Sequence, residues 1–466
     1  MSFSCLPREI ILVITDHLDH VGMNALLCTN SQVYDFLNKD LYRQDISRPQ
    51  SKSLIWAAKL GVEGTVRQAI YAGGHFNPVP ESFHIALQIA ADRGHAHLVE
   101  MLLKVDNINP NFRDTSLEYK AAPIGLAARR GHSVIVELLL AADNIDPNVK
   151  DQHSFTPLYW ACKMGHVRVV KQLLARDDVN FNPIEDGRTQ STSPLTVACI
   201  RSHTKIIHLL LAKDGIRVNF NGDIHGDTPL MMAVKRGLVG VVKSLLSRDD
   251  LEPNIVNNGG HHVLETAAGL GHIGIVKLLL DHPDIDPNFA SRDGRTALMQ
   301  ADRPDVVKLL LGQDGIDINQ QDNSGWTALC MAACFRNFEA AKILLEREDV
   351  NINLPDNSGW TPLFWACNHN CLQLVDLLLE KADIDPNPRD TNSGRTPLAH
   401  VCHYLGYEAV AVVRSLLSHP ATDPNAVNNN GVSILADYIT RWHPTGPDVV
   451  DSTYQQYYDM ESLLCS

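Results

Sequence analysis

The sequence predicts an all-α solenoid of about twelve helix-turn-helix copies, preceded by a small helical segment. Three observations predict this class. Related strings recur at near-constant spacing, most begin with residues typical of a helix start, and most carry an apolar stripe at helical spacing. Because one pair of helices cannot bury its own stripe, we expect neighbouring copies to stack and share a core.

The repeated unit is clearest in three strings, which begin at Thr156 (TPLYWACKMGHVRVVKQLL), Thr228 (TPLMMAVKRGLVGVVKSLL) and Thr361 (TPLFWACNHNCLQLVDLLL). Weaker copies fill the gaps, and the position of that first Thr recurs every 31 to 37 residues. Its occupants are Lys52, Ile85, Ala122, Thr156, Ser193, Thr228, His262, Thr296, Thr327, Thr361, Thr396 and Ser433. Such a period indicates an array of structural repeats.

Each full copy predicts two short helices. Thr followed by Pro, as at 156–157, supplies an N-cap and a favoured first residue for the first helix. Small residues such as Ala127-Ala128 allow the second helix to approach closely, and glycines such as Gly165 suit a left-handed helix end. The second helix carries apolar residues three and four positions apart, and polar tails such as DIDPN at 284–288 predict turns between copies.

Two copies depart from the pattern. The copy from Thr296 reads TALMQADRPDVVKLLL, so we expect its first helix to lose most of its last turn before Pro304. The copy from Ser433 decays into a stretch that we interpret as a C-terminal cap. The predicted organisation is therefore a helical segment at 1–45, a repeat array at 46–442 and a degenerate capping segment at 443–466.

The T-P-L-x-x-A signature of the copies and their period of about 33 residues resemble the ankyrin repeat family. The resemblance covers nearly all of the chain after residue 50. It implies a curved solenoid whose concave face binds other proteins.

Charge and hydropathy exclude several classes of protein. The net charge of −14, from 40 basic and 54 acidic residues, disfavours a whole-chain footprint for nucleic acid or anionic lipid. The uncharged apolar run at 10–14 is far shorter than the roughly 18 residues of a membrane span. We expect neither a signal peptide nor a membrane, and we predict a reducing cytoplasmic and/or nuclear location in which the ten cysteines are thiols.

No motif indicates catalysis. The sequence lacks a Gly-rich phosphate loop, a nucleophile elbow and an H-E-x-x-H motif, so we expect no enzymatic activity, no catalytic residue, no small-molecule substrate and no cofactor. Cysteines that follow the small position, Cys162, Cys199, Cys367 and Cys402, are expected to be buried fillers and not metal ligands. Histidines that recur after the turn, His95, His132, His166, His203 and His272, are expected to bond the turn backbone. Trp56, Trp160 and Trp365 share one position, which we assign to the core.

In ankyrin-like solenoids, partners contact the two residues after the small pair and the residue before the Thr position. The early copies place a basic ladder there: Arg93, Arg129, Arg130, Lys163, Arg201, Lys235 and Arg236. The later copies place mainly aromatic side chains there: Trp326, Phe335, Trp360, His369 and Tyr404. Our hypothesis is that the ladder holds an acidic protein surface while the aromatic residues anchor an apolar part. The alternative is that the basic residues only complement helix dipoles and solvent.

The opening segment, CLPREIILVITDHL at 5–18, matches no copy. It resembles the F-box family through Leu6-Pro7-x-Glu9-Ile10, Ile14, Leu18 and the stretch 23–28, as in fungal-type F-box/ankyrin proteins. That resemblance implies docking on a Skp-type adaptor of a cullin-RING ubiquitin ligase. The implied adaptor-binding residues are Leu6, Pro7, Ile10, Ile14, Leu18 and Leu26. Asn30-Ser31-Gln32 and Gly22 depart from the family pattern.

Two functions remain open at this stage. In the first, the array recruits a partner that the N-terminal segment presents to the ligase. In the second, the protein is a non-degradative scaffold or transcriptional co-regulator, and the N-terminal segment is only a cap packed on the first copy around Trp56.

Overall fold

The computed structural model describes residues 51–73, 80–114, 120–182, 193–220, 222, 225–404, 409–442 and 462–464. The predicted N-terminal segment with all six adaptor-binding residues lies outside this part of the chain, as does most of the predicted cap at 443–466. The chain divides into two compact units, Met1–Asp223 and Ile224–Ser466.

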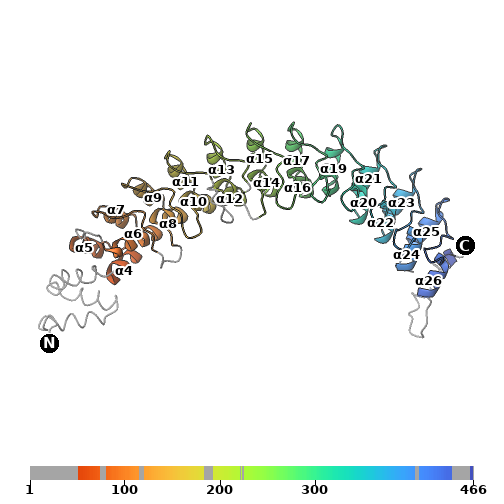
Figure 1. Cartoon of the computed structure of the whole chain (residues 1–466), viewed down its shortest axis with the longest axis horizontal. Helices are drawn as coiled ribbons and strands as arrows, with labels where there is room; N and C mark the ends of the chain where they lie inside the picture. The colour runs from red at the N-terminus through yellow and green to blue at the C-terminus, as the bar shows by residue number, and fades with distance from the viewer. Residues whose placement is uncertain are drawn as a thin grey trace, which may run out of the picture. The chain divides into compact units, whose positions relative to one another are not determined.

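The first unit contains five helix pairs in its described residues. The first helices are α4 (Lys52–Leu60), α6 (Glu81–Arg93), α8 (Pro123–Arg130), α10 (Pro157–Met164) and α12 (Pro194–Ile200). The second helices are α5 (Glu63–Gly73), α7 (Ala96–Leu103), α9 (Ser133–Leu140), α11 (Val167–Leu174) and α13 (Thr204–Leu211). The first helices pack in one row and the second helices in another (Figure 1).

The second unit contains six helix pairs and one further first helix in its described residues. Its first helices are α14 (Pro229–Lys235), α16 (Val263–Gly269), α18 (Ala297–Gln300), α20 (Ala328–Cys334), α22 (Pro362–Asn368), α24 (Pro397–Tyr404) and α26 (Ile434–Trp442). Its second helices are α15 (Val239–Leu246), α17 (Ile273–Leu280), α19 (Pro304–Leu311), α21 (Phe338–Leu345), α23 (Leu372–Leu379) and α25 (Val410–Ser418). The same two rows form here.

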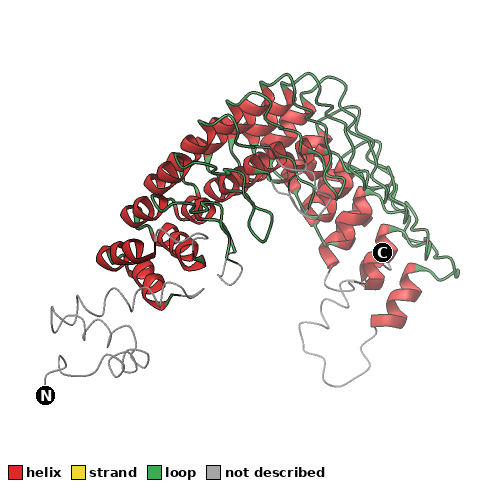
Figure 2. Ribbon diagram, turned by 60° about the vertical axis from the view of Figure 1, so that its left-hand side comes forward, coloured by secondary structure: helices red, strands yellow, loops and turns green. Residues whose placement is uncertain are grey.

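The described residues form helices, turns and loops without a strand (Figure 2). One isolated antiparallel bridge joins Val427 to Ser433. The prediction of an all-α solenoid of helix-turn-helix copies is confirmed. In the described part of the chain, we found no helix with the length and apolar character that a membrane crossing requires.

Capping residues explain most of the predicted helix starts. The Thr156 hydroxyl accepts a hydrogen bond from the N–H of Tyr159 at 3.2 Å, and Ser193 caps α12 in the same way. Two copies begin their first helix differently. Ser51, one residue before register position 52, caps α4, and α6 begins at Glu81, one turn before the register position of Ile85. Ile85 has no side-chain acceptor, so nothing local starts a helix there.

The helix ends follow the predicted left-handed turn. Gly94, Gly131 and Gly165 have φ values of +87°, +81° and +83°. The equivalent position is Arg336 after α20 and Asn370 after α22, with φ values of 58° and 50°. A side chain there carries a conformational cost, so the stacking of the repeats must hold these turns.

The core lies between the two rows of helices. Ala127 and Ala128 of α8 are fully buried, as are Val136 and Leu139 of α9. The four predicted cysteine fillers, Cys162, Cys199, Cys367 and Cys402, are at most 1% exposed, which confirms their packing role. Burial also raises the pKa of the Cys162 thiol, so this group stays neutral.

An asparagine ladder, which was not predicted from the sequence, joins the turns that follow the second helices. Asn353 Oδ1 accepts the N–H of Asp385 at 2.9 Å, while its Nδ2 donates to the carbonyl of Asp383 at 2.6 Å. The same two bonds are made by Asn111, Asn148, Asn182, Asn288, Asn319 and Asn387. Each asparagine thus ties its own repeat to the next one.

Candidate functional site

A buried carboxylate organises the hairpin before α10 in the first unit. Asp151 is 6% exposed, and its Oδ1 accepts the N–H groups of His153 and Phe155 at 2.8 and 2.9 Å. Its Oδ2 accepts the indole N–H of Trp160 at 2.8 Å. Asp151 therefore fixes Phe155 and Trp160 relative to one another.

Around these residues lies a cationic-aromatic cluster, which we define as Arg129, Phe155, Tyr159, Trp160, Lys163 and Arg201. The Phe155 and Tyr159 rings stack at 4.0 Å between centroids. The Trp160 ring lies within 4.9 Å of the Arg129 guanidinium carbon and 4.8 Å of Lys163 Nζ. One ring thus contacts two cations from successive repeats.

The electrostatics of this cluster favour an added negative charge. Burial, together with repulsion from Arg201 and Arg129, lowers the pKa of Lys163, and Asp151 opposes this only in part. Burial raises the pKa of Tyr159 to about 12, so its phenol stays neutral. Because a nearby anion would relieve the repulsion among three like charges, the cluster suits a carboxylate or phosphate group.

The remaining members of the predicted basic ladder differ in their surroundings. Arg130 pairs with Asp92 at 2.9 Å. Arg93 and Arg201 are exposed. In the second unit, Lys235 pairs with the fully buried Asp227 at 2.5 Å, whereas Arg236 is exposed. Some cations of the basic ladder are thus paired with carboxylates and others are exposed. The partner-binding role of the ladder stays a prediction.

The second unit carries an aromatic run over α20, α22 and α24, which we define as Trp326, Trp360, Phe364, Trp365, His369, His400 and Tyr404. Trp365 lies 4.6 Å from both Trp326 and Trp360 between ring centroids. Trp360 stacks on Phe364 at 4.5 Å, and His400 lies 5.0 Å from Trp360 and 4.6 Å from Tyr404. Three repeats therefore share one continuous set of ring contacts.

Asp356 fixes this run as Asp151 fixes the cluster in the first unit. It accepts the N–H groups of Ser358 and Trp360 and, at 3.0 Å, the indole N–H of Trp365. Neither carboxylate was predicted from the sequence. A usable signal was present, because Asp precedes Trp by nine residues in both copies.

Trp326 and Trp360, which precede the Thr position and were predicted to contact a partner, are both half-buried against Trp365. The core assignment of Trp56, Trp160 and Trp365 needs correction, because Trp56 and Trp365 are half-buried and only Trp160, 9% exposed, is in the core. Trp365 bonds Asp356 as Trp160 bonds Asp151, and it also packs on Trp326 of the preceding repeat.

Exposed apolar side chains border the aromatic run. Phe335 is 68% exposed and Tyr404 51%, whereas His369 is half-buried and stacks on Trp365 at 6.0 Å. Leu270, at the end of α16, is 50% exposed. These side chains occupy the helix ends where the sequence predicted partner contacts.

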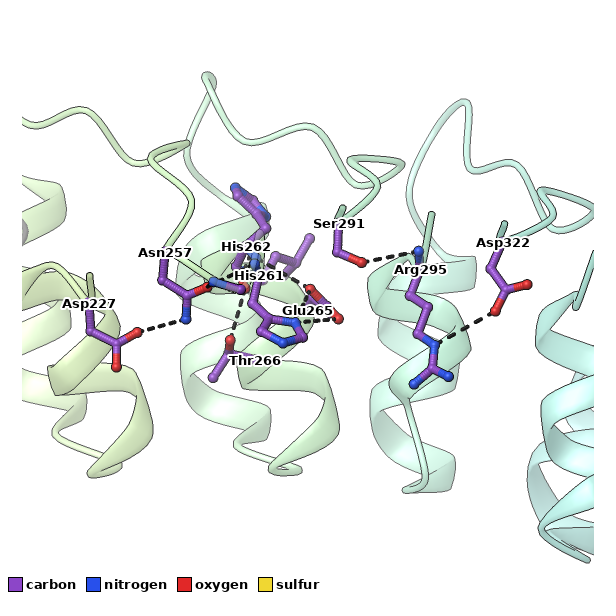
Figure 3. Close-up of polar contacts among 11 residues, drawn as sticks. Asp227, Asn257, His261, His262, Glu265, Thr266, Ser291, Arg295 and Asp322 are labelled. Carbon is purple, nitrogen blue, oxygen red and sulfur yellow. Dashed lines mark hydrogen bonds and ion pairs between the residues drawn. The ribbon is translucent and has the colours of Figure 1, made fainter. Parts of the chain in front are cut away.

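A network of polar side chains, buried except for His261, connects successive hairpins in the second unit (Figure 3). Asn257 Nδ2 donates to Asp227 at 2.9 Å, and His261 lies 3.2 Å from Glu265. Burial lowers the pKa of His262 to about 4, so it caps α16 as a neutral ring. These groups form hydrogen bonds with one another, so we assign the polar network a structural role.

The recurring histidines contact the preceding repeat. Nε2–H of His132 donates to the Asp92 carbonyl at 3.1 Å, and Nε2–H of His166 donates to the Arg129 carbonyl at 3.0 Å. His95 and His203 make equivalent contacts. The predicted backbone role is therefore confirmed for these four, with a partner one repeat away. Within the described ranges, no three His, Cys, Asp or Glu side chains are grouped to hold a metal ion.

Comparison with known proteins gives one family. The family model described as "Ankyrin repeats (3 copies)" matches residues 54–151, 87–184, 179–257, 240–322 and 302–390, which together span well over half of the chain. A search of curated proteins gave no match. Among solved structures, the chain is similar to the ankyrin repeat domain of Bcl-3, titled a unique member of the IkappaB protein family, at 29% identity. That match covers 46% of this chain and 94% of the other, with a TM-score of 0.41.

Proposed function

Because the chain belongs to the ankyrin repeat family, whose repeats bind protein partners, we propose that it acts by recruiting a protein and not by catalysis. The observation that carries this proposal is the aromatic run of the second unit, with Phe335 exposed beside it. Half-exposed aromatic side chains held in fixed positions are typical anchors of protein interfaces. Trp326, Phe335 and Trp360 anchor an apolar part of the partner.

The cationic-aromatic cluster of the first unit takes an acidic segment of the partner. Arg201 is exposed, and the repulsion around Lys163 falls when a carboxylate approaches. Charge attraction of this kind mainly speeds association and weakens as salt screens it.

The N-terminal segment presents the recruited partner to a Skp-cullin-type ubiquitin ligase. The support is the Leu6-Pro7-x-Glu9-Ile10 pattern, continued by Ile14 and Leu18. The protein acts in the cytoplasm, the nucleus or both. The seven cysteines in the described part of the chain are free thiols, in keeping with a reducing compartment.

Charge reversal tests the acidic-segment proposal. Arg201→Glu should weaken capture of the partner by the full chain, and the loss should grow as ionic strength falls. Arg168→Glu is a matched control, because Arg168 is exposed on α11 in the same unit but in the row of second helices. Equal capture by both variants at low salt contradicts the proposal. Arg130→Glu is a weaker probe, since Asp92 already pairs with Arg130.

A pull-down separates the two functions that the sequence left open. The intact chain, the full-length Ile10→Asp variant and a chain lacking residues 1–45 are compared for a co-purifying Skp-type adaptor. Adaptor bound to the intact chain and lost from both variants supports the ligase role. Its absence from all three samples rejects that role and favours the non-degradative scaffold or co-regulator.

A further inference from the structure

A cavity of about 500 Å³ lies in the second unit between α18 and α20, and the sequence explains its origin. Helix α18 has four residues, whereas α16 and α20 on either side have seven each. The missing turn would fill the space next to the last turn of α20. Its absence leaves an opening at the helix ends where the family meets its partners. The volume falls within the range of about 300–1,000 Å³ typical of ligand pockets.

Apolar side chains line the inner wall of the cavity. Leu298 and Met299 come from α18, and Met331 comes from α20; each is at most 6% exposed. Methionine side chains adapt to ligands of different shape. Phe335, which is 68% exposed, also lines the cavity, so a ligand that enters would cover this ring.

The charged groups that line the cavity are Arg295, Asp302 and Arg336, and Arg295 also forms an ion pair with Asp322 of the next repeat. Arg295 extends from the start of α18 towards Asp322 of the next repeat (Figure 3). Its Nε lies 3.6 Å from Asp322 Oδ2, which makes an ion pair but is too long for a hydrogen bond, so this N–H has no hydrogen-bond partner; the Arg295 side chain is 43% exposed. The Arg336 side chain is exposed. The cavity thus combines an apolar floor with a guanidinium that can still donate.

We propose that this cavity binds a short peptide segment of the partner in which one large apolar side chain is followed or preceded by an acidic residue. The apolar side chain enters against Met299 and Met331 and covers Phe335. The carboxylate accepts hydrogen bonds from Arg295, and Arg336 adds attraction. The inference rests on the proposed function, since it names one contact that the recruited protein makes with the second unit.

Methionine-methyl NMR of the full chain tests this proposal directly. The probes are three blocked dipeptide amides: N-acetyl-Glu-Phe, N-acetyl-Lys-Phe and N-acetyl-Glu-Gly. N-acetyl-Glu-Phe should shift the Met299 and Met331 signals in a saturable way and leave those of Met231 and Met232 in α14 unchanged. The lysine and glycine probes should each bind at least about fivefold more weakly, because they lose the ion pair or the apolar contact.

Two matched pairs of variants assign the contact. Arg295→Gln should weaken N-acetyl-Glu-Phe about fivefold and remove its preference over N-acetyl-Lys-Phe. Arg292→Gln, an exposed arginine of the same hairpin outside the cavity lining, should change neither. Phe335→Ala should weaken both Phe probes, whereas Leu270→Ala, at the equivalent end of α16, should not.

Three results would overturn the inference: methionine shifts without saturation, equal binding of the Glu and Lys probes, or equal effects of Arg295→Gln and Arg292→Gln. The proposed function fails differently. If partner capture survives substitution of Trp326 and Trp360 while the dipeptide binds as described, peptide binding by the cavity is supported and the anchoring role of the aromatic run is rejected.

Discussion

Asp356 offers a quantitative test of how the aromatic run is held. Its buried carboxylate accepts N–H groups from Ser358 at 2.8 Å, Trp360 at 2.9 Å and the Trp365 indole at 3.0 Å. Asn257 occupies the position of Asp356 in an earlier repeat of the same unit. Its amide oxygen accepts two backbone N–H groups at 3.0 Å each. An asparagine therefore fits the two backbone bonds but offers no acceptor to an indole.

The magnitudes follow from this difference. Asp356→Asn removes one charge-assisted hydrogen bond, which costs about 2 kcal/mol. Asp356→Ala also strands two backbone N–H groups that solvent reaches in part, at about 1 kcal/mol each, for a total near 4 kcal/mol. In the cycle that combines Asp356→Asn with Trp365→Phe, we expect a coupling energy of about 1 kcal/mol or more.

Urea unfolding followed by circular dichroism gives the change in the global free energy of unfolding. Hydrogen exchange of residues 356–379 gives the change in the local opening free energy, because repeat arrays can open one repeat at a time. Equal destabilisation by the Asn and Ala variants, or a coupling energy near zero in the cycle, would refute the assignment of the Asp356–Trp365 bond as the element that fixes the run.

Three further outcomes follow from the structure. His400 is 6% exposed, and burial lowers its pKa to about 4, so the neutral ring stabilises the fold fully above pH 6.5 and this stabilisation is lost as pH falls from 6.5 towards 4. In urea titrations, His400→Gln should flatten the slope of unfolding free energy against pH in that window by up to about 1.4 kcal/mol per pH unit. Asn353→Ala removes both ladder bonds and should cost about 2 kcal/mol in the same titrations, whereas Asn430→Ala, an exposed asparagine for which we found no side-chain bond, should cost little. Among the described cysteines, the half-buried Cys334 should react first with iodoacetamide in the native protein, and Cys162 and Cys367 only on unfolding; mass spectrometry of the alkylated peptides decides this, and early labelling of Cys367 would contradict the packing described.

Much of the fold could be predicted because each repeat encodes its helices locally. Thr156 and Thr361 supply caps that need no distant partner, and α18 is short because this copy has fewer residues before Pro304, which begins α19. Where this local signal is missing, the helix start departs from the repeat register. Ile85 cannot cap a helix, and α6 extends one turn earlier because its buried residues, such as Phe83, pack on neighbouring repeats.

The candidate site was less predictable, since it depends on contacts between repeats. Periodicity assigns a face to a side chain within one repeat, but it does not say how far that side chain reaches into the next. His132 bonds a carbonyl 40 residues away, and Trp365 meets Trp326 from the repeat before it. The cavity beside α18 also needed the structure, because the sequence predicted the lost turn but not what would line the space.

Site-specific photo-crosslinking tests the central claim that the ends of the first helices recruit the partner. A benzophenone amino acid is placed at Phe335 or Tyr404, and at Val239 on α15 as a control of similar exposure, 47%, in the same unit. We predict that the same protein becomes crosslinked at Phe335 and Tyr404 and not at Val239. Crosslinking of that protein at Val239 with equal yield, or at none of the three positions, would contradict the account.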